Sequence, residues 1–258
     1  MNRTKTLVTA FCLIFGGGVS AYAGDFTTTI EPVRYEGMVS ISFDDSYRNQ
    51  HVKALPILEA AGMKGTFYLS TKPIQKGYRA YMTPAQVKDL ARKGHEVAGH
   101  TVSHANLAKL GRARIEREVG NSKAYLEKLI GVPVTGFAYP YGAISRTAKV
   151  ALKKAGYTHA RGVDFEELNT PATDRYALKS QCVDKSDSLA SIQKRIDTAK
   201  AEGKWYILCF HRVQARGGGR YAVTPAFFQK IVDYIKATGI KVVTVKSGLA
   251  AEVQVAAR

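Results

Sequence analysis

Two short polar clusters contain the residue types that hydrolytic chemistry requires. Asp44 and Asp45 follow the apolar run Met38–Phe43, and His100 and His104 follow a second short apolar run. Two imidazoles and one carboxylate are a common ligand set for a catalytic Zn²⁺, which leaves a further position open for water. A second carboxylate beside that set can take a proton from the water. The pattern therefore predicts metal-assisted hydrolysis, with Zn²⁺ as the default ion and Co²⁺ or Ni²⁺ as alternatives.

Each cluster also has a plainer interpretation. A pair of aspartates after a strand can cap a helix or form an Asx-turn. Two histidines four residues apart can lie on the polar face of a helix. Because both clusters follow candidate strands, we prefer the interpretation in which they share one site.

Two later segments supply further candidates. His211 follows an apolar run that begins near Trp205, and its ordinary pKa lies near neutrality, so it could protonate a leaving amine or alkoxide. The segment Tyr139, Pro140 and Tyr141 could form one wall of a sugar pocket and offer a backbone N–H to a developing oxyanion. Its plainer interpretation is an ordinary turn that contains Pro and Gly.

Short apolar runs alternate with amphipathic stretches through the rest of the chain, which predicts a parallel sheet. Each polar candidate follows a different run, as in (β/α) barrels, whose sites lie at the carboxyl ends of the strands. An open sheet would gather them at a switch point between fewer strands. We therefore predict a single α/β domain with a distorted barrel of about seven parallel strands. The candidate strands are Met38–Phe43, Gly65–Ser70, Glu96–Gly99, Thr135–Ala138, Tyr157–Arg161, Tyr206–Phe210 and Lys241–Val245.

The first 23 residues have the pattern of a cleavable signal peptide. A positively charged start is followed by the apolar run Leu7–Val19 and by an A-x-A site that ends at Ala23. A membrane anchor is the alternative, but the run is short for a bilayer span. We expect cleavage after Ala23, export to a periplasm or the medium, a catalytic domain over residues 24–258, and no stable membrane insertion.

Charge and cysteine content limit the partners. The formal net charge is +17, but the basic residues are scattered and form no dense block, so we expect no nucleic-acid partner. An anionic polymer of the cell envelope is a better match for an exported basic protein. In an oxidising compartment, Cys182 and Cys209 could remain two buried thiols or form a disulfide.

With these motifs in this order, the chain resembles the polysaccharide deacetylases of the NodB-homology type, a family of metal-dependent carbohydrate esterases. The similarity extends from about Gly37 to about Ala250 and includes flanking phrases such as Gly65–Tyr68 (GTFY) and Val242–Thr244 (VVT). The paired aspartates and the HxxxH spacing are specific in combination, and the later motifs are weaker. The resemblance implies a distorted barrel of (β/α) units.

The resemblance also implies a role for each site residue. Asp44 would be the catalytic base and His211 the general acid. The region around Tyr141 would line the site and donate to the oxyanion. The metal ligands would be Asp45, His100 and His104.

The chain departs from the family pattern at four positions. The first motif usually ends in Gly and here ends in Ser46, the fourth motif is unclear near Asp164, and Cys209 replaces the usual Leu. At the third motif, Ala138 stands where an Arg usually orients the base. Because a cation beside Asp44 would keep that carboxylate ionised, this departure has the largest chemical consequence.

Arg161 offers a replacement for the missing cation. It lies at the end of the next candidate strand, from which its guanidinium could reach Asp44. The hypothesis rests on the absence of Arg at Ala138 together with this strand-end position. We therefore expect Arg161 to orient the base.

The function implied by the resemblance is the removal of acetyl groups from N-acetylated amino sugars, such as those of chitin, peptidoglycan or poly-N-acetylglucosamine. Two alternatives follow from the same residues. The machinery could cleave an O-acetyl ester on a polysaccharide, or the chain could be a catalytically silent glycan-binding module. The complete Asp-Asp-His-His-His set argues against the silent module.

Overall fold

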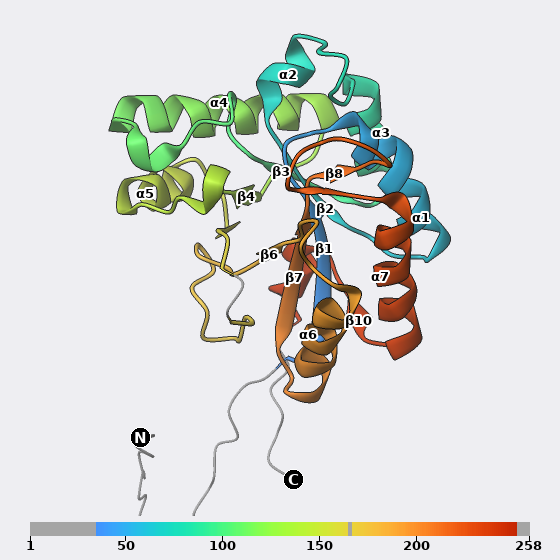
Figure 1. Ribbon diagram of the computed structural model, residues 1–258. Helices are drawn as coiled ribbons and strands as arrows, with labels where there is room; N and C mark the ends of the chain where they lie inside the picture. The colour runs from blue at the N-terminus through green and yellow to red at the C-terminus, as the bar shows by residue number, and fades with distance from the viewer. Residues whose placement is uncertain (1–34, 165–166, 252–258) are drawn as a thin grey trace, which may run out of the picture.

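The computed structural model describes residues 35–164 and 167–251, and the predicted signal peptide lies outside them. A curled parallel sheet forms the centre of the molecule, and helices cover its outer surface (Figure 1). All seven predicted strands are present, and an eighth, β6, was missed because two residues carry no readable pattern. The sheet strands are β1 (Met38–Phe43), β2 (Thr66–Leu69), β3 (Glu96–Gly99), β4 (Gly136–Ala138), β5 (His159–Arg161), β6 (Gln181–Cys182), β7 (Trp205–Phe210) and β10 (Lys241–Val242).

The strands follow the order β5-β4-β3-β2-β1-β7-β6, and β10 pairs with the start of β1. The segment before β6 returns to β5, because Leu178 N–H donates to Ala160 O at 3.0 Å and Gly162 N–H donates to Leu178 O at 2.9 Å. This contact links β5, at one edge of the sheet, to the segment that leads into β6 at the other edge. The predicted distorted (β/α) barrel is therefore confirmed.

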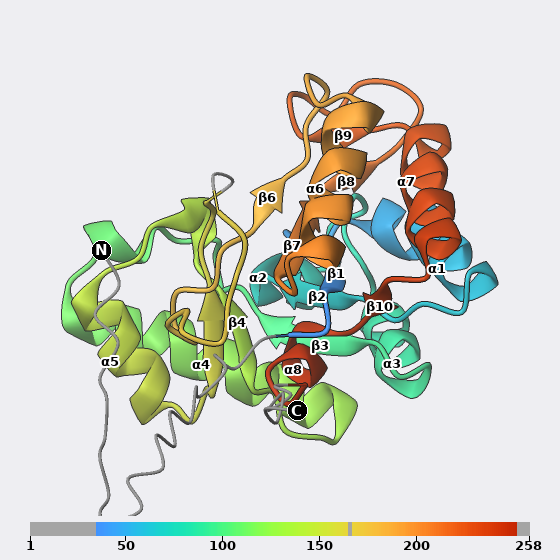
Figure 2. The same cartoon turned by 90° about the horizontal axis from the view of Figure 1, so that it is seen from below.

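Helices lie against the outer face of the sheet, with α4 and α5 side by side and α6 and α7 packed together elsewhere on that face (Figures 1 and 2). The helices are α1 (Leu55–Ala60), α2 (Thr71–Gln75), α3 (Pro84–Arg92), α4 (Arg112–Ile130), α5 (Arg146–Lys154), α6 (Leu189–Ala201), α7 (Pro225–Thr238) and α8 (Val245–Gly248). Two short strands, β8 (Arg212–Val213) and β9 (Ala222–Val223), form a separate pair beyond β7. Among the described residues, no helix has the length and apolar character that a bilayer crossing requires.

The apolar runs supply the core between sheet and helices. Every residue of β1 is buried, and the Phe43 ring stacks on Phe67 with centroids 4.7 Å apart. Phe228 of α7 meets Phe43 edge-on at 5.7 Å. Aromatic pairs of this kind add to the free energy of burial and fix how α7 sits on β1.

Local chemistry explains where the helices start and where one prediction differs. Thr83 and Gln86 form a capping box at α3. Apolar residues recur at helical spacing over 51–61, which predicts a helix there. The structure begins this helix instead as a wider π-helical turn, Gln50–Ala54, in which Leu55 N–H donates to Gln50 O. The next residue, Pro56, has no N–H for an ordinary helical bond, so the wider turn satisfies the backbone at lower cost.

Candidate active site

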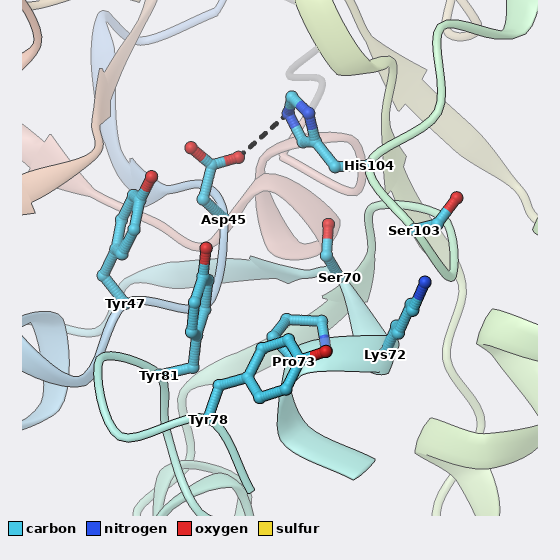
Figure 3. Close-up of a pocket in the computed structure, with 9 residues that line it drawn as sticks. All are labelled: Asp45, Tyr47, Ser70, Lys72, Pro73, Tyr78, Tyr81, Ser103 and His104. Atoms are coloured by element: carbon cyan, nitrogen blue, oxygen red, sulfur yellow. Dashed lines mark ion pairs between the residues drawn. The ribbon is translucent and has the colours of Figure 1, made fainter. Parts of the chain in front are cut away.

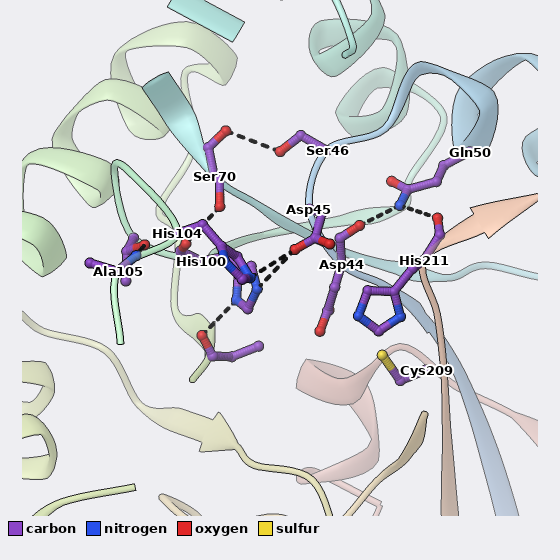
Figure 4. Close-up of polar contacts among 12 residues, drawn as sticks. Asp44, Asp45, Ser46, Gln50, Ser70, His100, His104, Ala105, Cys209 and His211 are labelled. Atoms are coloured by element: carbon purple, nitrogen blue, oxygen red, sulfur yellow. Dashed lines mark hydrogen bonds and ion pairs between the residues drawn. The ribbon is translucent and has the colours of Figure 1, made fainter. Parts of the chain in front are cut away.

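Three candidate metal ligands come together at the carboxyl ends of β1 and β3. The Nε2 atom of His104 lies 3.0 Å from Asp45 Oδ1, and that of His100 lies 3.4 Å from the same oxygen. The three donor atoms all lie within 4.8 Å of one another (Figure 4). A left-handed backbone at Asp45, with φ of 73°, turns its side chain out of the strand's alternation and toward the two histidines.

The hydrogen bonding of these residues fits a divalent cation. His100 Nδ1–H donates to Ala138 O at 2.8 Å, which leaves the Nε2 lone pair facing Asp45. The Nε2 lone pair of His100 and the carboxylate of Asp45 are both hydrogen-bond acceptors. Because two acceptors repel each other, a positive charge between them is needed. Burial opposes protonation of His100, yet Asp44 and Asp45 raise its pKa above the ordinary value, so the surroundings favour a cation at this point.

The backbone around the site is strained. Among the described residues, every non-glycine residue with a left-handed φ lies here. Such residues are uncommon, and they persist where surrounding structure holds them. Ser46 stands where the family pattern has Gly, and its side-chain hydroxyl donates to Ser70 O at 3.0 Å, which helps to hold the turn. The set comprises Asp45, Ser46, Thr101, His104 and Tyr141.

A buried glutamate that sequence reasoning missed holds the histidine loop. Glu118 of α4 accepts the backbone N–H groups of Val102 and Ser103, each at 2.9 Å, and the Ser103 hydroxyl at 2.7 Å. These bonds fix the loop between His100 and His104. The available signal was a charged residue within the apolar stripe of α4, where a polar side chain needs a partner.

Asp44 and Arg161 form a buried ion pair behind the metal ligands. Arg161 Nη2 donates to Asp44 Oδ1, and the guanidinium lies 4.4 Å from the centroid of the Tyr68 ring. Burial raises the pKa of Asp44, but Arg161 and the neighbouring histidines outweigh it and hold that pKa below the ordinary value. Arg161 is directly opposite Ala138 in the β4–β5 register. The positive charge beside Asp44 therefore comes from β5, whereas the family pattern places an Arg on β4 at the position of Ala138.

His211 lies beside Asp44 at the end of β7 (Figure 4). Gln50 ties the two segments together, since its Nε2 donates to His211 O at 2.7 Å and also to Asp44 O. The ring of Tyr221 stacks on the His211 ring with centroids 4.9 Å apart. Burial lowers the pKa of His211 below its ordinary value, although both aspartates oppose the shift. Sequence reasoning missed Gln50 and Tyr221, whose neighbours are distant in the chain.

The predicted aromatic wall is smaller than expected. Tyr141 is 69% exposed and meets the His104 ring edge-on at 4.7 Å, so it borders the site. Tyr139 is buried in the core and its hydroxyl donates to Tyr176 O at 3.0 Å. Pro140 is also buried. The expectation that Tyr139 and Pro140 line the pocket is corrected accordingly: both residues directly after β4 are still packed in the core, and the chain reaches the surface only at Tyr141.

Two cavities flank Asp45. One cavity, of about 320 Å³, has aromatic walls formed by Tyr47, Tyr78 and Tyr81 (Figure 3). Lys72 also lines this cavity. The other, of about 370 Å³, lies on the His211 side and is lined by Arg212, Arg220 and Tyr221 among others. Tyr47 and Asp45 border both cavities, so both open beside one of the candidate metal ligands. These tyrosines could not be chosen from the sequence, because no spacing rule sets them apart.

The remaining histidines lie outside the candidate site, as expected. His51 pairs with Asp89 at 3.0 Å and His95 pairs with Glu59 at 2.9 Å. His159 faces Glu96 at 3.3 Å. Each imidazole therefore has a structural partner.

Comparisons with known proteins identify relatives of this chain. A sequence profile of the polysaccharide deacetylase family matches residues 33–160. The putative polysaccharide deacetylase YxkH of Bacillus subtilis is 31% identical over 122 residues, which are 47% of this chain and 43% of that protein. A chitin deacetylase of Arthroderma benhamiae is 26% identical over 223 residues, which are 85% of this chain and 54% of that protein.

A solved structure shares the fold. The peptidoglycan N-acetylglucosamine deacetylase Bc1960 superposes with a TM-score of 0.59 at 20% identity, covering 86% of this chain and 91% of that one. The chain belongs to the polysaccharide deacetylase family. It spans about half the length of the curated relatives described above.

Proposed function

We propose that this protein is a metal-dependent hydrolase that removes N-acetyl groups from amino-sugar polymers or oligomers and releases acetate. One observation carries the proposal: a three-ligand cluster for a cation lies beside an ionised, buried carboxylate and a histidine. This combination supplies a site for a Lewis acid, a base and an acid together.

The residues divide the chemistry as follows. Asp44, held ionised by Arg161, accepts the proton of the attacking water. The water oxygen adds to the acetyl carbonyl carbon, and the backbone N–H of Tyr141 donates to the oxyanion. His211 gives its proton to the amine as the C–N bond breaks. Acetate and the free amino sugar are the products.

Asp45, His100 and His104 would hold the divalent cation. When bound, it would polarise the carbonyl and make the water more acidic. Zn²⁺ is the default ion, and Co²⁺ or Ni²⁺ also suit a site of two imidazoles and one carboxylate.

The cavities on both sides of Asp45 favour a substrate longer than one sugar unit. Flat tyrosine faces on one side suit the apolar faces of sugar rings, and arginines on the other side suit polar or anionic groups. An exported protein would meet such glycans in the cell envelope or outside the cell. We include export through the predicted signal peptide, and contact with anionic envelope polymers, in the proposal.

The test is acetate release by the purified protein from chitin oligomers, peptidoglycan, poly-N-acetylglucosamine and acetylated xylan. Release that stops with a chelator, returns with added Zn²⁺ and is abolished in Asp44→Asn would support the proposal. Release from acetylated xylan alone would replace it with an O-acetyl esterase. No release from any substrate by a protein that still binds one cation would favour the silent binding module.

A further inference from the structure

Two thiols lie next to the proposed general acid, and the proposed reaction uses neither. Cys182 of β6 and Cys209 of β7 are direct partners in the parallel register of these strands. Both are free thiols. Their sulfur atoms and one ring nitrogen of His211 all lie within 4.8 Å of one another. Figure 4 shows the Cys209 sulfur beside the His211 ring.

The surroundings of this cluster suit a bound ion. His211 Nδ1 is buried and, within the described part of the chain, has no hydrogen-bond partner. His211 also lines the 370 Å³ cavity, so one member of the cluster borders open space. A buried nitrogen without a partner is unusual unless a water or an ion occupies the position it faces.

The charges also balance. Burial raises the pKa of the Cys209 thiol well above its ordinary value, but Arg161 Nη2 lies 3.4 Å from Cys209 Sγ and acts in the opposite direction, so a guanidinium is in place to support a thiolate once a cation binds. Two thiolates would neutralise a divalent cation, while Arg161 remains balanced by Asp44. The pocket could therefore take the ion without gaining net charge, which keeps the cost of burial low.

We propose that Cys182, Cys209 and His211 form a second site, for a thiophilic divalent cation such as Zn²⁺ or Cd²⁺, and that its occupation inhibits the enzyme. Two metal–sulfur bonds form as each thiol releases one proton to solvent, and no oxidation or reduction takes place. The ion also takes a nitrogen lone pair of His211. With the cation on one ring nitrogen, His211 can no longer become an imidazolium, and the N–H left on the other nitrogen is too weak an acid to protonate the leaving amine, so excess metal would stop the reaction. The inhibitory part rests on the proposed function, and the binding part does not.

Binding is tested first, in the Asp45→Ala variant, which lacks a ligand of the catalytic site. Titration with Cd²⁺ under reducing conditions is followed by the ultraviolet thiolate-to-Cd²⁺ charge-transfer band. We expect one bound Cd²⁺ per chain and the band. Adding Cys182→Ser should abolish the band, and adding His211→Gln should weaken binding more than about tenfold. Adding His51→Gln, which changes a histidine away from the cluster, is the matched control and should leave the titration unchanged.

Inhibition is tested by adding Zn²⁺ to the metal-free protein during acetate release. We expect activity to rise with the first equivalent and to fall with excess, and Cys182→Ser should shift the fall to Zn²⁺ concentrations more than about tenfold higher. Absence of the band although both thiols react with a thiol reagent would overturn the site. So would a Cys182–Cys209 disulfide in the exported protein, since the sulfurs would then be unavailable. A normal band without activity on any glycan would instead contradict the proposed function.

Discussion

At the scale of single residues, the buried pair of Asp44 and Arg161 determines how the base behaves. A carboxylate removed from water normally becomes harder to ionise. Here Arg161 makes the largest contribution against that effect and the neighbouring histidines add to it, so the pKa of Asp44 lies below its ordinary value. The base is therefore ionised throughout the neutral range, and its proton affinity depends most strongly on the Arg161 guanidinium.

Replacing this guanidinium should move the pH dependence of activity. In Arg161→Gln the burial of Asp44 remains while its counter-charge is lost, so the pKa rises and the acidic limb of kcat/KM shifts to higher pH. We expect a loss of about tenfold to a hundredfold at neutral pH, partly recovered at higher pH, with unchanged metal content. Arg161→Lys, which keeps a positive charge, should shift the limb less. An acidic limb that stays in place in Arg161→Gln would contradict the assignment.

His211 can be tested through the leaving group. An amine must be protonated to leave, whereas an activated aryl ester leaves without a proton. His211→Gln should therefore lower kcat for an N-acetylated glycan about a hundredfold or more, but that for an aryl acetate by less than about tenfold. Equal losses on both substrates would show that His211 acts by holding the site together and not as the acid.

At the scale of elements, the carboxyl end of β3 is packed closely enough to exclude a methyl group. A Cβ added to Gly99 would lie 2.3 Å from the Tyr157 hydroxyl oxygen and would also meet Phe137. His100 follows directly, so this packing also sets where the metal ligand emerges. Glycine is therefore required at position 99 by the side chains of Tyr157 and Phe137 that pack against it, and not by the backbone conformation of the turn that follows.

Gly99→Ala should therefore lower the free energy of unfolding by about 1–3 kcal/mol through overpacking, measured by urea denaturation. The matched control is Gly120→Ala in the interior of α4, where an added Cβ meets nothing within 4 Å. That change should raise the stability by about 0.5–1 kcal/mol, because alanine favours a helix. A neutral result for Gly99→Ala would mean that Tyr157 moves aside at little cost.

The elements also show what the sequence could and could not predict. Long apolar runs such as β1 and β7 were predicted with correct or nearly correct ends, because burial on both faces leaves a clear pattern. β6 has only two residues and no such pattern, so it was missed. β10 ends at Val242 and not at Val245 as expected, because Val245 already begins α8. Glu118 and Gln50 support the site through contacts across the fold, which no local spacing reveals.

At the scale of the whole molecule, the site joins the ends of strands that are far apart in the chain. Asp45 follows β1, and the two histidines follow β3, so a bound cation would link these loops. An ion that binds only the folded state adds stability by mass action. Metal binding should therefore be visible in global unfolding as well as in activity.

Zn²⁺ at about a hundred times its dissociation constant should add about 2.7 kcal/mol and raise the Tm by roughly 5–10 °C for a chain of this size. The measurement is calorimetry in the Cys182→Ser background, which removes the second proposed site. Asp45→Asn in the same background should lose the shift. A shift that survives in Asp45→Asn would place the stabilising ion elsewhere.

The position of Arg161 has a consequence for judging distant relatives. Screens that score an alignment column by column would mark Ala138 as a lost arginine and could class this chain as inactive. Because the two positions are neighbours across adjacent strands, the charge can be lost from one column and kept through the other. Whether a relative is an enzyme should thus be judged by the charge that reaches the aspartate, whichever strand supplies it.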